Sequence, residues 1–97
     1  MRPFIREAIE DHIDRVLGEE ELVSASKMLT ESFAPTAKNV EDALYGYIFG
    51  RAIEFAFSII QICYQRVPST DEHLEIYKII RRRAVEIKSQ IKLITSR

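Results

Sequence analysis

Apolar residues recur at three- and four-residue intervals along most of the chain, which is the spacing of one face of an α-helix. Three breaks interrupt this pattern, at Gly18, at residues 34–36 (Ala-Pro-Thr) and at residues 67–70 (Val-Pro-Ser-Thr). They divide the chain into helical segments at 3–17, 19–33, 40–66 and 70–95. The pattern predicts an all-α protein with a single domain over residues 1–97.

The first two segments are short, and Gly18 separates them. Residues 3–17 carry one isoleucine-rich face, and residues 19–33 carry a weaker stripe that ends at Phe33. Because Leu17 and Leu22 lie about 140° apart on a helical wheel, the apolar phase slips at Gly18 and favours a break. The alternative is a continuous helix through Gly18, which would give a monomeric three-helix bundle of matched lengths.

The segment 40–66 is apolar over more than half of its circumference, whereas an ordinary surface helix buries an apolar stripe only slightly wider than about 100°. It therefore requires neighbours on at least two sides and is predicted to be the central helix. Asn39, followed three residues later by Asp42, is a plausible capping pair for its start.

The last segment begins with Ser69 and Glu72, which have the spacing of a capping box. Its apolar residues then follow spacings of 3, 4, 3, 4 and 3, a heptad seam that predicts near-parallel packing along the central helix. These seam residues are Tyr77, Ile80, Ala84, Ile87, Ile91 and Ile94. The expected fold is an antiparallel helical bundle, in which this long hairpin packs with two shorter N-terminal helices.

Two short helices cannot cover a long hairpin whose first helix is apolar over most of its surface. We therefore expect a homodimer in which the central helices meet near a two-fold axis. The spacing Gly46-x-x-x-Gly50 indicates a close helix crossing, either there or against the first helix. The candidate interface residues are Tyr45, Phe49, Ala52, Ala56 and Cys63.

The central segment is also long enough to span a membrane. Arg51 and Glu54 lie in its middle, however, and each charge there costs about 2.5–3.5 kcal/mol of insertion free energy. We expect no membrane span.

The net charge of −1 conceals an uneven distribution. Residues 76–97 hold seven basic side chains and one acidic one, so residues 1–75 are correspondingly acidic.

One face of the last segment, opposite its isoleucine seam, could bind the phosphates of a nucleic acid, RNA included. The alternative is a solvated face that offsets the acidic helices. No aromatic residue lies within this face, so base stacking is not indicated. The face consists of Lys78, Arg81, Arg82, Lys88 and Lys92.

Arg66 and His73 are the candidate catalytic residues. Their spacing resembles the R-x4–6-H signature of HEPN-type helical ribonucleases and toxin subunits, although Val67 stands where that family has a polar residue. The resemblance implies a ribonuclease site at a dimer interface. His73 would be its acid–base group, and Arg66 would stabilise the phosphate transition state.

An acidic cluster on the first segment contains Glu7-Ala8-Ile9-Glu10, which is similar to the E-x-x-E pattern of all-α nucleotide pyrophosphatases. Those enzymes need a second acidic pair on a facing helix, and Asp71 with Glu75 matches it poorly. The cluster is interpreted as a solvent face, and His12 as a residue at the boundary of the core.

The chain has no phosphate-binding loop, metal-ligand set, nucleophile constellation or cofactor fingerprint. We therefore expect a non-enzymatic, homodimeric interaction or scaffold module, with no cofactor and no identifiable small-molecule ligand. A lone Cys63 and the absence of an apolar leader segment indicate a cytoplasmic protein. Fourteen Ile, one Asn and three Gln are typical of thermophilic proteins, including archaeal ones.

Overall fold

The computed structural model describes residues 1–32 and 39–96, most of which belong to five α-helices. No strand occurs within these two ranges, so the prediction of an all-α protein is confirmed. The helices are α1 (Pro3–Val16), α2 (Glu19–Ser32), α3 (Val40–Tyr64), α4 (Thr70–Arg82) and α5 (Ala84–Thr95).

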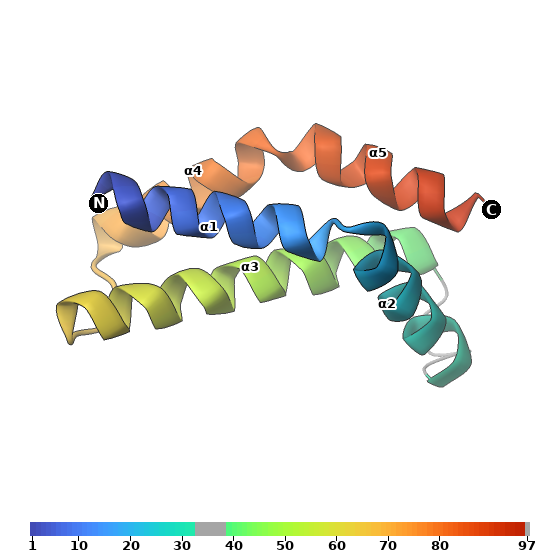
Figure 1. Cartoon of the computed structure of the whole chain (residues 1–97), viewed down its shortest axis with the longest axis horizontal. Helices are drawn as coiled ribbons and strands as arrows, with labels where there is room; N and C mark the ends of the chain where they lie inside the picture. Colours follow the sequence, from blue (N-terminus) through green and yellow to red (C-terminus); the bar gives the residue numbers. More distant parts are fainter. Residues whose placement is uncertain (33–38, 97) are drawn as a thin grey trace.

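The longest helix, α3, extends along most of the molecule; α1, α4 and α5 lie on one side of it, and α2 crosses near its start (Figure 1). Its most extensive interface is with α1, followed by α5, α2 and α4. Figure 1 shows α2 turning away from α1 near the start of α3. The molecule is elongated, with extents of 40 × 23 × 20 Å. One apolar cluster joins all five helices, and isoleucine from α1, α3, α4 and α5 supplies most of it.

The helix ends follow the local signals in the sequence. The break at Gly18 is confirmed, because α1 ends at Val16 and α2 begins at Glu19, so the continuous helix was wrong. Asn39 caps α3 by accepting a hydrogen bond from the Asp42 amide at 3.1 Å. Phe33 and the break at 34–36 lie outside the described residues.

The single helix expected over 70–95 is wrong, since the segment divides into α4 and α5 at Arg83. The predicted seam has Ala84 between Ile80 and Ile87, but in the structure the Arg83 side chain, 13% exposed, turns inward there, and an arginine cannot be buried as an isoleucine can. Its guanidinium instead donates to the Glu10 carbonyl oxygen of α1 at 3.1 Å. The seam prediction also placed Tyr77 inside, but the inward position belongs to Ile76 and Tyr77 is 39% exposed.

Two of the predicted interface residues are wrong, because they lie on the buried side of α3. Ala52 and Ala56 are fully buried within the protomer, in line with Leu44, Ile48 and Ile60. They lie on the face of α3 that packs against the other helices, so they cannot contact a second copy. The sequence pattern could not separate these small core residues from the outer arc, because both sides of α3 are apolar.

Candidate functional site

One side of α3 carries half-buried aromatic and apolar side chains that no other helix covers completely. We call it the aromatic face. It lies away from α1, which contacts α3 through His12, stacked on Phe55 with ring centroids 4.1 Å apart. The aromatic face consists of Tyr45, Gly46, Phe49, Gly50, Ile53 and Phe57.

Aromatic contacts extend this face from α3 onto the neighbouring helices. Phe57 packs edge-on against His73 of α4 at 4.7 Å, and His73 stacks with Tyr77 at 6.4 Å. At the other end, the Lys88 ammonium of α5 lies 5.4 Å from the centre of the Tyr45 ring. The sequence predicted Tyr45 and Phe49 as interface residues, but the contribution of α4 becomes visible only in the fold.

The two glycines of the aromatic face are open to solvent. A Cβ atom added at Gly46 or Gly50 would meet nothing within 4 Å. The predicted alternative of a close crossing against the first helix is therefore wrong. The backbone of α3 remains accessible at these positions, which is the condition for close approach of another helix.

Among the described helices, α3 is long and apolar enough, by length and composition, to cross a membrane. Only 28% of its most apolar stretch is buried within the protomer. Arg51 is exposed in the middle of α3, where it donates a hydrogen bond to the Tyr47 hydroxyl at 2.9 Å. Arg51 and the exposed Glu54 thus place two charged side chains in the middle of α3.

The two candidate catalytic residues have separate partners. Arg66 donates two hydrogen bonds to the Glu72 carboxylate, at 2.6 and 3.1 Å. His73 instead packs between Phe57 and Tyr77. The structure thus places Arg66 in the connection that caps α4, where its charge is already bound.

The predicted capping box at the start of α4 is confirmed, and Glu72 is its centre. The Glu72 carboxylate accepts from the Ser69 amide at 2.8 Å, and the Ser69 hydroxyl accepts from the Glu72 amide at 3.2 Å. The hydrogen bonds from Arg66, and then from the Ser69 amide, lower the pKa of Glu72 to about 2. Sequence reasoning found the box but missed Arg66 as its third member.

Replacing Glu72 by glutamine should lower the free energy of unfolding by about 1–2 kcal/mol at pH 7, through loss of the charged cap. Because folding lowers the pKa of Glu72, its contribution is complete above about pH 4.5 and is lost as the pH falls towards 2. Urea denaturation between pH 2 and 7 should show the two proteins converging at low pH. Asp71→Asn is the control on the same helical turn, and a Glu72→Gln deficit that is constant with pH would contradict this role.

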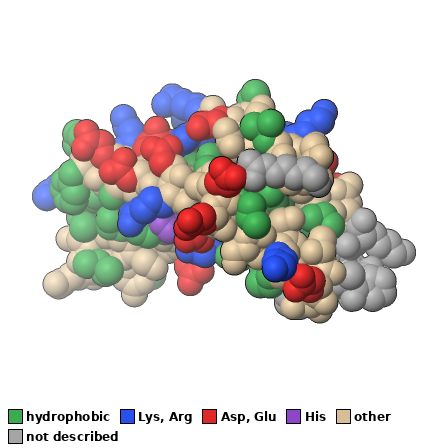
Figure 2. Space-filling view, turned by 45° about the vertical axis from the view of Figure 1, so that its right-hand side comes forward, with side chains coloured by type: hydrophobic (Ala, Val, Ile, Leu, Met, Phe, Trp, Pro, Cys, Tyr) green, Lys and Arg blue, Asp and Glu red, His purple; other side chains and the backbone are tan. Residues whose placement is uncertain are grey.

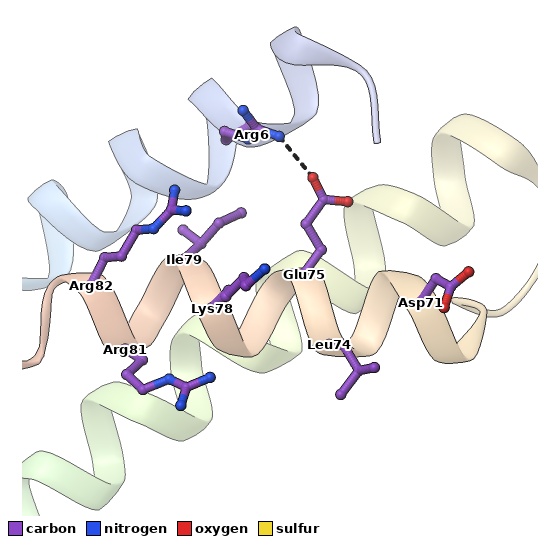
Figure 3. A pocket seen from close by; sticks show the side chains of 8 residues that line it. All are labelled: Arg6, Asp71, Leu74, Glu75, Lys78, Ile79, Arg81 and Arg82. Atoms are coloured by element: carbon purple, nitrogen blue, oxygen red, sulfur yellow. Dashed lines mark hydrogen bonds and ion pairs between the residues drawn. The ribbon is translucent and has the colours of Figure 1, made fainter.

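The five residues of the predicted basic face do not lie on one continuous surface, because the helix is interrupted at Arg83. Lys78, Arg81 and Arg82 line a hollow of about 560 Å³, together with Arg6 of α1 (Figure 3). The remaining two residues of that face, Lys88 and Lys92, line a separate hollow of about 390 Å³. That second hollow also contains Glu41, Asp42 and Tyr45.

Arg83 uses part of the acidic cluster of α1. Its side chain is 13% exposed and forms ion pairs with Glu10, Asp14 and Glu86. Figure 2 shows acidic and basic side chains close together over the upper half of the surface in view. No group of three potential metal-ligating side chains occurs in the part of the chain that the structure describes. The sequence pattern gave no signal for this network, because the predicted seam has Ala84, and not Arg83, as its inward residue between Ile80 and Ile87.

His12 lies at the edge of the core, as the sequence predicted, and its Nε2 atom is buried without a hydrogen-bond partner. Burial, followed by the charges of Arg51 and Arg15, lowers the pKa of His12. The lowered pKa favours the neutral ring, which packs against Phe55.

Comparison of the chain with models of protein families, with curated proteins and with solved structures gave no match.

Proposed function

We propose that this chain is a homodimeric interaction module in which the aromatic faces of two copies meet. The single observation that carries the proposal is the uncovered state of α3, whose side opposite α1 is aromatic, apolar and open at two glycines. In this arrangement α4 and α5 return along α3 in the antiparallel sense. With α4 and α5 in these positions the aromatic face stays uncovered, and the second copy packs on it.

The surface area of the chain supports a second copy. A folded monomer of 11.3 kDa exposes about 5700 Å². This chain exposes 6455 Å². The surplus of roughly 700 Å² is close to the ~800 Å² that each partner buries in a standard interface. Its Cα radius of gyration of 14.4 Å also exceeds the ~12.5 Å of a compact chain of this length.

Glu54 is exposed on α3, three residues after Arg51. Arg51 lines a hollow with His12 of α1, so it lies on the α1 side of α3 and not beside the aromatic face. The apolar contacts of the aromatic face would therefore supply most of the binding free energy.

Replacing Gly46 and Gly50 together by alanine should distinguish an effect on the dimer from an effect on the stability of the protomer. Inside the protomer each methyl group meets nothing, and alanine favours a helix over glycine by about 1 kcal/mol, so helix α3 should be stabilised. In the dimer the same methyl groups separate the two backbones, and we expect the dissociation constant to rise at least about tenfold. Sedimentation equilibrium measures the dissociation constant, and circular dichroism follows the helix.

Gly18→Ala is the comparison variant, because a Cβ there lies 3.1 Å from the Arg15 carbonyl oxygen and far from the aromatic face. It should destabilise the protomer without a specific effect on association. An unchanged dissociation constant in the Gly46→Ala, Gly50→Ala protein would show that these glycines are not at the interface.

A further inference from the structure

Four basic side chains from two helices line the hollow between α1 and α4. They are Arg6, Lys78, Arg81 and Arg82, with Asp71 and Glu75 as the acidic members and Leu74 and Ile79 as the apolar ones. Figure 3 shows Arg82 reaching towards α1, where Arg6 lies, whereas Arg81 and Leu74 extend from the other side of α4. We call this hollow the α1/α4 groove. Its lining side chains carry a formal charge of +2, although the whole chain carries −1.

One of the two acidic side chains of the groove already has a partner. Glu75 accepts a hydrogen bond from Arg6 at 2.7 Å, and this bond lowers the pKa of Glu75. Within the described part of the chain, Lys78, Arg81 and Arg82 take part in no ion pair, and neither does Asp71. Three positive charges within five residues of α4 therefore remain against a single carboxylate.

The basic residues of the same region that stabilise the fold are different ones. Arg66 is bound to Glu72, and Arg83 is bound to three carboxylates and a carbonyl oxygen. On α5, Lys88 lies over Tyr45, in a hollow that also holds Glu41. Three of the five residues of the predicted basic face thus lie in the α1/α4 groove, whereas Lys88 and Lys92, which also form no ion pair among the described residues, share their hollow with Glu41 and Asp42.

We infer that the α1/α4 groove binds phosphate groups of a nucleic-acid backbone. Lys78 and Arg82 are four residues apart, so their Cα atoms are separated by about 6 Å along the axis of α4. Arg6 brings a further guanidinium from α1 against the same space. Lysine and arginine side chains placed in this way bind phosphodiester oxygens by charge, without reading the base sequence.

This inference does not depend on the dimer. The groove lies between α4 and α1, whereas Tyr77 and His73 extend α4 towards α3 and the aromatic face. A second copy on the aromatic face would leave the groove open, so each dimer would present two grooves.

The test is fluorescence anisotropy of a labelled single-stranded oligouridine, titrated with the full chain at several salt concentrations. With the three cations of α4 in the groove, log K should fall against log salt with a slope of about −2, because each contact contributes about −0.7 on a single strand. That slope amounts to roughly twentyfold weaker binding at 200 mM than at 50 mM salt. The double variant Lys78→Gln, Arg82→Gln should reduce the slope to less than half.

The matched control is Lys27→Gln, Lys92→Gln, which removes the same number of charges from exposed positions outside the groove. It should leave affinity and salt slope within about twofold of the wild-type values. Inorganic polyphosphate should compete with the oligonucleotide, and competition that depends on Lys78 and Arg82 would identify phosphate as the recognised group. Absent binding at 50 mM salt, or an equal loss in the two double variants, would overturn the inference.

Discussion

Replacing Ile53 by glutamate is expected to convert the protein into monomers that remain folded. Ile53 is a half-buried member of the aromatic face, between Gly50 and Phe57, and near a two-fold axis the substitution places two carboxylates at the same interface. An unpaired charge in a desolvated contact costs about 2 kcal/mol or more in each protomer, so the dissociation constant should rise roughly 1000-fold. Light scattering on a sizing column measures the change.

The matched control is Ile62→Glu, the same substitution nine residues further along α3. Ile62 is 75% exposed and lies outside the aromatic face, so its variant should associate as the wild-type protein does. Circular dichroism should show unchanged helicity in both proteins. If the Ile53→Glu and Ile62→Glu proteins showed the same particle mass in solution, the aromatic face would not be the interface.

Replacing Arg83 by methionine should destabilise the protomer more than any other single change of a charged residue. The Arg83 side chain is 13% exposed, and its loss removes a donor from the Glu10 carbonyl oxygen and leaves two carboxylates, on Asp14 and Glu86, without their arginine partner. We expect the free energy of unfolding to fall by about 3 kcal/mol, because the partners are themselves half exposed and keep part of their hydration. The melting temperature should fall by roughly 10–20 °C.

Arg82→Met provides the comparison. Arg82 is adjacent in sequence but exposed, and it takes part in no ion pair among the described residues. Its replacement should change the free energy of unfolding by at most about 0.5 kcal/mol. Equal losses from Arg82→Met and Arg83→Met would mean that the junction of α4 and α5 is stabilised by something other than the Arg83 network.

Local signals in the sequence predicted the helix ends well. Gly18, Asn39 and the pair Ser69–Glu72 act on backbone groups within four residues of themselves, so their effects do not depend on the rest of the fold. The break at Arg83 depends on α1, because the residues that receive the guanidinium lie about 70 positions away along the chain. Periodicity alone continues the heptad seam from Ile80 through Ala84 to Ile87 and therefore predicts one helix where two exist.

The aromatic face was predicted only in part for a similar reason. An apolar arc wider than half the wheel shows that α3 has several neighbours, but it does not say which side each neighbour takes. Ala52 and Ala56 proved to face the core, whereas Tyr45 and Phe49 remain on the uncovered side. The basic face divided in the same way, because it was drawn on a straight helix that the chain does not form.

The most direct measurement of the central claim is the mass of the wild-type protein in solution at micromolar concentration. Light scattering on a sizing column should give twice the 11.3 kDa of one chain. Reading the absorbance ratio at 260 and 280 nm in the same run would also reveal nucleic acid that purifies with it. A mass of one chain across that concentration range would contradict the homodimer, and with it the role proposed for the aromatic face.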